Sequence, residues 1–282
     1  MSWTLDVGWA KRSVPTDSVK QWNHCAWARR FRAFAHPTIL ALAFATQASL
    51  AADLRVYSSG APAQVAQGLA AGFLAATGHR VVLTSATIAE IRRKLSAGDT
   101  PDAIILPAPI IAALDKAGSL VAGSRIELAR VGIGVAVRAG ASLPDISTDD
   151  AIRKVLVEAR SIVHPDPVGG GFAGAQIARM MTRLGIAGLV KPKTSIMFAI
   201  GGGTAAVARG DVEIGLFNIS EILSDKGVAL VGPLPPSLQS YITFVGAIHA
   251  GSASPDAARD FLRSLAAPQA RDAWVRGGLE PF

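Results

Sequence analysis

The chain has 282 residues, of which 50% are hydrophobic and 17% are charged. This composition excludes an intrinsically disordered chain, because disorder requires few apolar residues and many charges. The length suffices for one large domain or for two medium domains, each with its own apolar core.

The formal net charge of +7 is concentrated at the N-terminus. Residues 1–51 contain six Lys or Arg and two Asp and carry +4, whereas the remainder has 22 basic and 19 acidic residues and carries +3. The short basic cluster Arg92-Arg93-Lys94 falls on one turn of a predicted amphipathic helix, where we expect a solvated face. No basic stripe with interleaved aromatic residues follows the N-terminal segment, which argues against a nucleic-acid partner.

Residues 1–51 have the organisation of a secretory signal peptide with a long N-terminal extension. Three arginines within residues 29–32 precede an apolar run over residues 39–45, and the small residues Ser49 and Ala51 follow. This order predicts cleavage after Ala51 and export to the periplasm. The apolar run is shorter than the roughly 20 residues that a bilayer-spanning helix needs. The single cysteine, Cys25, also lies here, so the body of the chain has no disulfide and no thiolate metal site.

From residue 53 onward, short apolar runs alternate with amphipathic helical patterns that end at glycine. The apolar runs indicate strands, and apolar residues at helical spacing indicate helices. Strands are predicted over residues 54–57, 81–84 and 103–106, each followed by a helix. Repeated strand–helix–strand units imply an α/β fold with mostly parallel sheets and helices on their faces.

The second half of the body continues the pattern less regularly. Strands are predicted over residues 131–137, 161–163, 195–199, 213–217 and 241–248. Ser147 is predicted to cap the helix that begins beside it, and the proline-rich block at residues 232–236 is predicted to be a linker. The last two helices are expected to begin at Pro255 and Pro268.

This layout predicts two lobes joined by two chain crossings, near Val135 and near Ser240. Lobe I would comprise residues 52–135 and 240–282, and lobe II residues 136–239. Two crossings form a hinge, and a cleft between two lobes is a common ligand site.

Four turns share one local chemistry, because each follows a predicted strand, contains small residues and opens a helix. A helix N-terminus presents unpaired N–H groups and roughly half a positive charge, and small residues let an anion approach that backbone. Ligands of open α/β sheets bind beyond the carboxyl ends of the strands. Four such turns could hold a small oxyanion without Lys or Arg, although each alone is also compatible with ordinary loop structure. The candidate ligand-binding residues in these turns are Ser58, Ser59, Ala61, Ser85, Thr87, Gly171, Phe172, Gly202 and Gly203.

Signatures of catalysis are sparse. His79, His164 and His249 lack the spacing of a metal site, and His79 is expected to be exposed. Glu213 and Glu221 are interpreted as edge or surface carboxylates rather than as an acid/base pair, and no nucleophile-elbow motif is present. The sequence therefore predicts no catalytic residue, no metal ligand and no cofactor.

Several short motifs occur in a characteristic order along residues 53–282. They are LRVYSSG at 54–60, AATGH at 75–79, PDAII at 101–105, DP at 166–167, RGDVEIG at 209–215, SEI at 220–222 and VGPLP at 231–235. With these motifs the chain resembles the periplasmic molybdate-binding proteins and their relatives with the type II solute-binding fold.

The resemblance implies a two-lobed type II fold that captures a small oxyanion, with molybdate or tungstate as the leading expectation. In this family serine hydroxyls and backbone N–H groups from the same turns hold the anion, and a monomer delivers it to an ABC transporter permease in the inner membrane. Two positions depart from the family pattern. The first-loop serine corresponds to Ala61, with Ser59 as a substitute, and a tyrosine that touches the anion corresponds to Asn218 or to its neighbour Phe217. Asn218 therefore joins the candidate residues.

Three functions remain open at this point. The first is an exported binding protein for a small oxyanion, and the second is an exported enzyme acting on a small anionic substrate. The third is a signalling module that reports the same kind of ligand. The absence of an acid/base pair, a nucleophile and metal spacing favours a binding protein over an enzyme.

Overall fold

The structure is a computed structural model that describes residues 51–168, 171–197 and 202–282. The predicted signal peptide lies outside the described residues except for Ala51, as do three of the turn glycines and the end of the strand predicted over residues 195–199. Within the described residues, no helix is long and apolar enough to cross a membrane.

The elements follow the predicted alternation of strands and helices. The first are β1 (Asp53–Ser58), α1 (Ala61–Thr77), β2 (Arg80–Ser85), α2 (Ile88–Ser96), β3 (Ala103–Pro107) and α3 (Ala108–Lys116). The next are β4 (Ile126–Arg138), α4 (Asp149–Glu158), β5 (Ile162–Pro165), α5 (Gly171–Arg183), α6 (Ala187–Val190), the 3-10 turn η1 (Lys191–Lys193) and β6 (Thr194–Met197). The last are α7 (Gly202–Arg209), β7 (Ile214–Asn218), α8 (Ile219–Ser224), β8 (Val228–Pro233), β9 (Tyr241–Ile248), α9 (Pro255–Ala266), the 3-10 turn η2 (Pro268–Ala270), α10 (Arg271–Arg276) and β10 (Glu280–Pro281).

The strands pair in the order β2-β1-β3-β9-β4-β7-β5-β6, and β8 and β10 also pair with β4. Parallel pairing occurs within two sets of strands, which we call the first strand group (β1, β2 and β3) and the second strand group (β5, β6 and β7). The pairs that involve β4 or β9 are antiparallel. The α/β class predicted from the sequence is confirmed. The antiparallel pairs join strands that are distant in the sequence, and the pattern of apolar residues within each strand does not indicate them.

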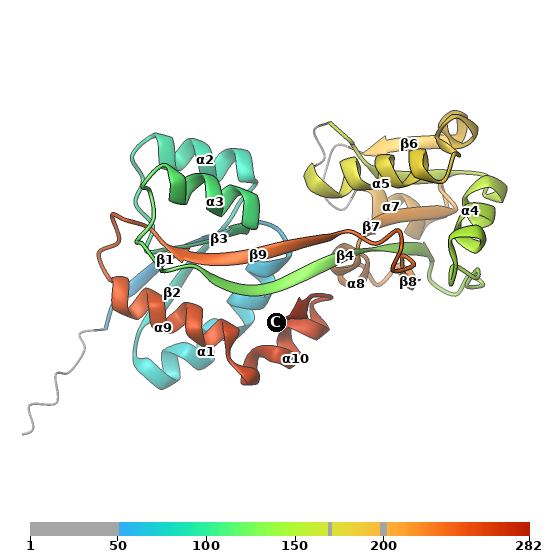
Figure 1. Ribbon diagram of the computed structural model, residues 1–282. Coiled ribbons are helices and arrows are strands. Elements are labelled where there is room, and N and C mark those ends of the chain that lie inside the picture. The colour runs from blue at the N-terminus through green and yellow to red at the C-terminus, as the bar shows by residue number, and fades with distance from the viewer. Residues whose placement is uncertain (1–50, 169–170, 198–201) are drawn as a thin grey trace, which may run out of the picture. The chain divides into compact units, whose positions relative to one another are not determined.

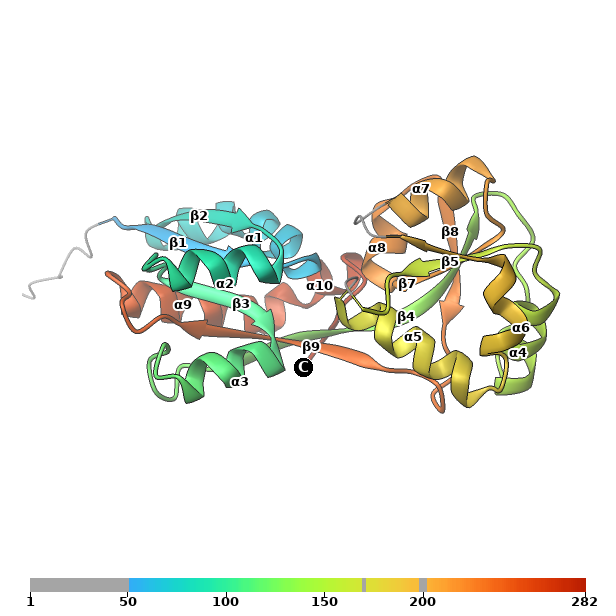
Figure 2. The same ribbon diagram turned by 90° about the horizontal axis from the view of Figure 1, so that it is seen from above.

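β4 links the two strand groups, as Figures 1 and 2 show. Its residues up to Gly132 pair with β9, whereas residues 133–136 pair with β7. Gln239, just before β9, is hydrogen-bonded to both backbone groups of Ile133. The partners of β4 therefore change between Gly132 and Ile133, close to the crossings expected near Val135 and Ser240.

Apolar side chains alternate across the sheet in the first strand group. Ala103 and Ile105 of β3 belong to a core with α1, α9 and α10, whereas Ile104 and Leu106 belong to a core with α2 and α3. Figure 1 shows α2 and α3 on one face of these strands and α1 and α9 on the other. A strand covered by helices on both faces needs apolar residues at successive positions, which explains the continuous apolar run of β3.

The second strand group is covered in the same way. Val135 of β4 belongs to a core with α4 and α5, and its neighbour Ala136 belongs to a core with α7 and α8. Both strand groups are therefore packed between helices, and the turns project at the strand ends.

Three local predictions are wrong. The cap of α4 is Thr148 rather than Ser147, because the Thr148 hydroxyl accepts the N–H of Ala151. The block at residues 232–236 is not simply a linker, since its first two residues belong to β8. His79 is buried rather than exposed, and its Nδ1 accepts a hydrogen bond of 3.1 Å from the backbone N–H of Ala52.

Candidate functional site

The carboxyl ends of the two strand groups face each other along β4. β3 ends at Pro107, which pairs with Phe244 of β9, and Phe244 lies opposite Ala129 of β4. β7 runs against β4 and ends at Asn218, opposite Ile133. Ala129 and Ile133 are four positions apart, so the two ends are about 13 Å apart along β4, at about 3.3 Å per residue. Because ligands of open α/β sheets bind beyond the carboxyl ends of strands, this interval is the candidate site.

The turn after β1 brings predicted site residues together. Ser58 ends β1 and pairs with Ser85, the last residue of β2, and with Ile105 of β3. The N–H of Ala86 donates to the Ser58 carbonyl (3.1 Å), and the N–H of Ser59 donates to the Ile105 carbonyl (3.2 Å). Ser58 is fully buried, and its hydroxyl has no hydrogen-bond partner among the described residues. Since a buried polar group without a partner is unfavourable, this hydroxyl is a candidate for a hydrogen bond to a ligand.

The helices after β1 and β2 begin with different caps. α1 begins at Ala61 after Gly60, which has a φ of 59° and provides no side-chain cap. α2 is capped by Thr87, whose hydroxyl accepts a hydrogen bond of 3.2 Å from the N–H of Glu90. The Thr87 hydroxyl still has its own hydrogen to donate, and both Thr87 and Ser85 are exposed. This end of the first strand group therefore offers hydroxyl and N–H donors.

In the second strand group, α7 begins against the end of β7. Gly203, the second residue of α7, lies so close to the ring of Phe217 that any side chain there would overlap the ring. Gly215 of β7 contacts the same ring equally closely. Phe217 is buried in the core, which leaves Asn218 as the residue whose side chain lies at the strand end. Of the two positions that the family tyrosine could match, Phe217 lies in the core and Asn218 ends the strand.

α5 is held against the end of β5. It begins at Gly171, and the next residue, Phe172, is 41% exposed. A side chain at Gly174 would overlap the backbone carbonyl of Asp166, so the first turn of α5 lies directly on the chain that leaves β5. The N–H of Asp166 donates to the Met197 carbonyl at the end of β6. The first turn of α5 is therefore held at the end of β5, next to the end of β6.

Asn218 forms a side-chain pair with Glu221. Nδ2 of Asn218 donates a hydrogen bond of 2.6 Å to a carboxylate oxygen of Glu221, and the side-chain oxygen of Asn218 is buried without a partner among the described residues. Burial raises the pKa of Glu221, and the hydrogen bond from Asn218 partly offsets that rise. The interpretation of Glu221 as a surface carboxylate is therefore wrong.

The spacing of Asn218 and Glu221 is a signal that our sequence analysis missed. Asn three residues before Glu at the start of a helix is the pattern of a capping box. In the structure, however, the Asn218 side chain caps no backbone N–H of α8 and is hydrogen-bonded to Glu221 instead. A capping box whose side chains pair with each other leaves one polar atom available for another partner.

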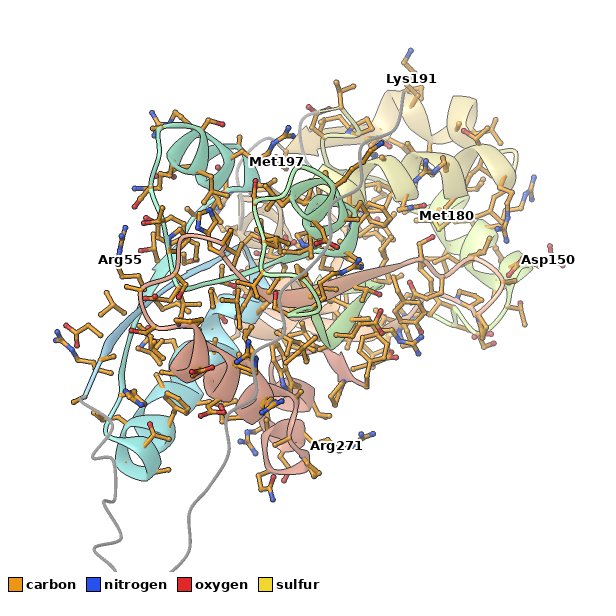
Figure 3. All side chains as sticks on the ribbon, turned by 60° about the vertical axis from the view of Figure 1, so that its left-hand side comes forward. Arg55, Asp150, Met180, Lys191, Met197 and Arg271 are labelled. Carbon is orange, nitrogen blue, oxygen red and sulfur yellow. The ribbon has the colours of Figure 1, made fainter. Side chains whose placement is uncertain are left out.

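The basic side chains singled out in the sequence lie on the surface. Arg92 and Arg93 are exposed as predicted, and Lys94 lies 5.9 Å from the centre of the Tyr57 ring. Figure 3 shows Arg55 extending outward from β1, where it pairs with Asp99. Within the described ranges, no cluster of three or more His, Cys, Asp or Glu side chains could hold a metal ion.

A cavity of about 550 Å³ lies at the other end of β7 and is separate from the candidate site. It is lined in part by Arg138, Arg160 and Glu213. Glu213 accepts hydrogen bonds from the backbone N–H (2.8 Å) and the guanidinium (3.2 Å) of Arg160, the first of which is the main cause of its lowered pKa. The Glu213 carboxylate therefore already has hydrogen-bond donors, both from Arg160.

The structure therefore gathers the predicted residues into two sets. Ser58, Ser59, Ala61, Ser85 and Thr87 lie at the end of the first strand group. The second set, at the end of the second group, comprises Gly171, Phe172, Gly202, Gly203 and Asn218. No hydrogen bond between described residues joins the two sets.

Comparison with known proteins gives a close relative and several similar structures. The aconitate isomerase of Pseudomonas sp. is 32% identical over 241 residues, which cover 81% of this chain and 87% of that protein. The periplasmic molybdate-binding protein of Azotobacter vinelandii is similar in structure, with a TM-score of 0.62 and 20% identity over 80% of this chain and 98% of that one. PEB3 of Campylobacter jejuni with L-phospholactate bound has a TM-score of 0.63 and 18% identity over 81% of this chain and 99% of that one.

The similar structures establish the type II periplasmic-binding fold. Their ligands differ in chemistry, so the expected preference for molybdate is not singled out. The family model for bacterial extracellular solute-binding proteins matches residues 54–280, which is nearly the whole described body. The chain therefore belongs to the bacterial extracellular solute-binding proteins.

Proposed function

We propose that this protein binds a small anion outside the cytoplasm and delivers it to the permease of an ABC transporter. The observation that carries the proposal is a pair of buried polar atoms without a partner among the described residues, the hydroxyl oxygen of Ser58 and the side-chain oxygen of Asn218, at the facing strand ends. One comes from each strand group, so a ligand that satisfies both would link the two groups.

The surrounding donors suit an anion. The uncapped start of α1 at Ala61 provides an N–H group, and the Thr87 hydroxyl provides a hydrogen. Hydrogen bonds to a charged ligand contribute about 1.5–3 kcal/mol each. A few fixed donors can therefore hold an anion without an ion pair that must be broken for release.

For the ligand we propose a small polycarboxylate of the aconitate type ahead of molybdate or tungstate. The relative with 32% identity acts on aconitate, whereas the molybdate-binding protein is only 20% identical. Two positions of the molybdate-binding pattern also differ, since Ala61 and Asn218 replace serine and tyrosine. A larger ligand with several oxygens could reach both strand ends across the interval of about 13 Å.

A panel of anions tests this proposal. Thermal unfolding is measured with cis-aconitate, trans-aconitate, citrate, molybdate, tungstate, sulfate and phosphate. A ligand that binds only the native protein raises the melting temperature, by about 2.7 kcal/mol of added stability at 100 times its Kd. A shift with aconitate supports the carboxylate, and a shift with molybdate and tungstate alone supports the oxyanion. The absence of a shift with any anion would refute the proposed site.

A second candidate function is the isomerisation of aconitate itself, favoured by the 32% identity to an aconitate isomerase. Isomerisation by proton transfer needs a group that removes a proton from the carbon beside the double bond and returns it to the far end of the allylic system. Glu221 is a candidate for this group, because its carboxylate is hydrogen-bonded to Asn218. Incubation with cis-aconitate in D₂O, followed by NMR, would show trans-aconitate with deuterium incorporated. If the protein binds cis-aconitate but leaves it unchanged after prolonged incubation, isomerisation is refuted and only the binding function remains.

A further inference from the structure

We infer that Glu221 is a positioning residue that decides whether Asn218 presents a hydrogen-bond donor or an acceptor to the ligand. In its neutral form, Glu221 donates a hydrogen bond from its O–H to the side-chain oxygen of Asn218. The N–H group of the same amide is then directed toward the anion. The inference rests on the proposed anion site and specifies how that site selects its ligand.

The geometry of the pair supports this role. Nδ2 of Asn218 and the nearer carboxylate oxygen of Glu221 are 2.6 Å apart, while the other end of the amide is buried without a partner among the described residues. Because one end of the amide is held by Glu221, the other end is fixed in direction. A ligand meets the amide oxygen when Glu221 is hydrogen-bonded to the nitrogen, and it meets the amide nitrogen when Glu221 is hydrogen-bonded to the oxygen.

Two arrangements of the pair are chemically consistent. When Glu221 is ionised it can only accept, so the amide nitrogen faces it and the amide oxygen faces the ligand. When Glu221 is neutral its O–H can donate to the amide oxygen, and a half-turn of the amide then directs the nitrogen toward the ligand. The oxygens of an anion need donors. Anion binding therefore selects the arrangement in which Glu221 carries its proton.

The surroundings of Glu221 favour the neutral form. α8 lies against β4, β7 and β8, and β7 and β8 carry no titratable side chain. The titratable residues on the other adjoining segments are Glu127, Arg130 and Arg138 of β4, Arg276 and Glu280 near Gly278, and Asp225 after α8. Arg130 is occupied by an ion pair with Glu280. Burial is the main influence on the pKa of Glu221 and raises it, with the Asn218 hydrogen bond acting in the opposite direction.

The direction of the pH dependence follows from proton linkage. Bound anion stabilises neutral Glu221, so its pKa is higher in the complex than in the free protein. Affinity is greatest below the pKa of the free protein and falls as the pH rises through it. One linked proton gives a loss of up to tenfold per pH unit until the pKa of the complex is reached.

Affinity measured by titration calorimetry from pH 5 to pH 8 tests the inference, with cis-aconitate and molybdate as probes. The variants are Glu221→Gln, which imitates the neutral acid, and Glu158→Gln, a control on the exposed face of α4. We compare the Kd of each protein at the same pH, which cancels the ionisation of the probe itself. As the pH rises, the affinity of the wild type and of Glu158→Gln should fall relative to that of Glu221→Gln, by up to tenfold per pH unit.

A second measurement does not depend on the folding of a variant. Binding enthalpies of the wild type in buffers with different heats of ionisation should show uptake of a fraction of one proton near the pKa of Glu221. Parallel pH profiles for the wild type and Glu221→Gln, or no proton uptake beyond that of the probe, would overturn the role of Glu221 while leaving the anion site intact. Failure of every protein to bind either probe at any pH would instead refute the anion site.

Discussion

The side chain of Gln239 is paired with the backbone of Ile133 as if it were a further strand residue. Its oxygen accepts the N–H of Ile133 (2.8 Å) and its nitrogen donates to the Ile133 carbonyl (2.9 Å). These bonds lie where β4 changes partner from β9 to β7. The Gln239 side chain therefore adds two hydrogen bonds to β4 at the point where its strand partner changes.

We predict that Gln239→Leu destabilises the protein by about 1–3 kcal/mol, because the backbone N–H of the buried residue Ile133 loses the Gln239 oxygen, whereas the Ile133 carbonyl keeps the N–H of Leu234. Urea unfolding monitored by circular dichroism measures the change. Gln64→Leu on the exposed face of α1 is the matched control and should change stability by less than about 0.5 kcal/mol. Equal stability of the two variants would show that the Gln239 bonds are dispensable.

Gly203 is predicted to be intolerant of a side chain. A methyl group there would overlap the ring of Phe217, so Gly203→Ala should cost about 1–3 kcal/mol and displace the start of α7. Gly188→Ala on α6 is the control, since no atom lies near that position. The double variant with Phe217→Leu should recover part of the lost stability, because the smaller side chain makes room. A fully stable Gly203→Ala would contradict the close packing of α7 against β7.

Substitutions of Ser85 and Thr87, at the end of the first strand group, should distinguish effects on anion binding from effects on stability. Ser85→Ala should weaken anion binding by roughly tenfold to a hundredfold and leave stability unchanged, because Ser85 is exposed. Thr87→Ala should weaken binding similarly and also cost about 1 kcal/mol of stability, since Thr87 caps α2. Thr87→Ser keeps the cap and the hydroxyl and should resemble the wild type. Arg92→Ala, on the outer face of α2, should leave affinity unchanged, and a larger loss there than at Ser85 would argue against a site built on hydroxyls.

The export prediction concerns the first residues of the body. Ala52 is bonded through its N–H to His79 and through its carbonyl to the N–H of Arg80, so cleavage after Ala51 would leave β1 and its partner strand intact. We predict that protein recovered from a periplasmic extract begins at Ala52, as measured by intact mass. Recovery solely from the cytosol with residues 1–51 attached would contradict the prediction.

The local elements could be predicted from the sequence because their signals are local. The strand over residues 241–248 and the helix that starts at Pro255 occur as predicted, since an apolar run and an N-terminal proline depend on neighbouring residues alone. β8 was missed because Gly232 and Pro233 indicate a turn, whereas the pairing with β4 that makes them a strand comes from distant residues.

Features of the candidate site that depend on burial were harder to predict from the sequence. The grouping of the candidate residues at strand ends could be predicted because parallel strands place their carboxyl ends together. The partial burial of Glu221 could not, because it results from the packing of α8 against β4 and β8. The burial of His79 likewise depends on the packing of its ring against Phe73, and on its hydrogen bond to Ala52, the residue before β1.

The most direct test of the account is the affinity of the best anion from the panel for Ser58→Ala and Asn218→Leu, measured by titration calorimetry. These two residues end strands in different groups, and their polar groups are the buried ones without a partner among the described residues. The account predicts that each change weakens binding roughly tenfold to a hundredfold, that Ser58→Ala does not lower the melting temperature, and that Ser96→Ala, an exposed control at the end of α2, binds like the wild type. Wild-type affinity in both site variants, with one anion still bound per chain, would contradict it.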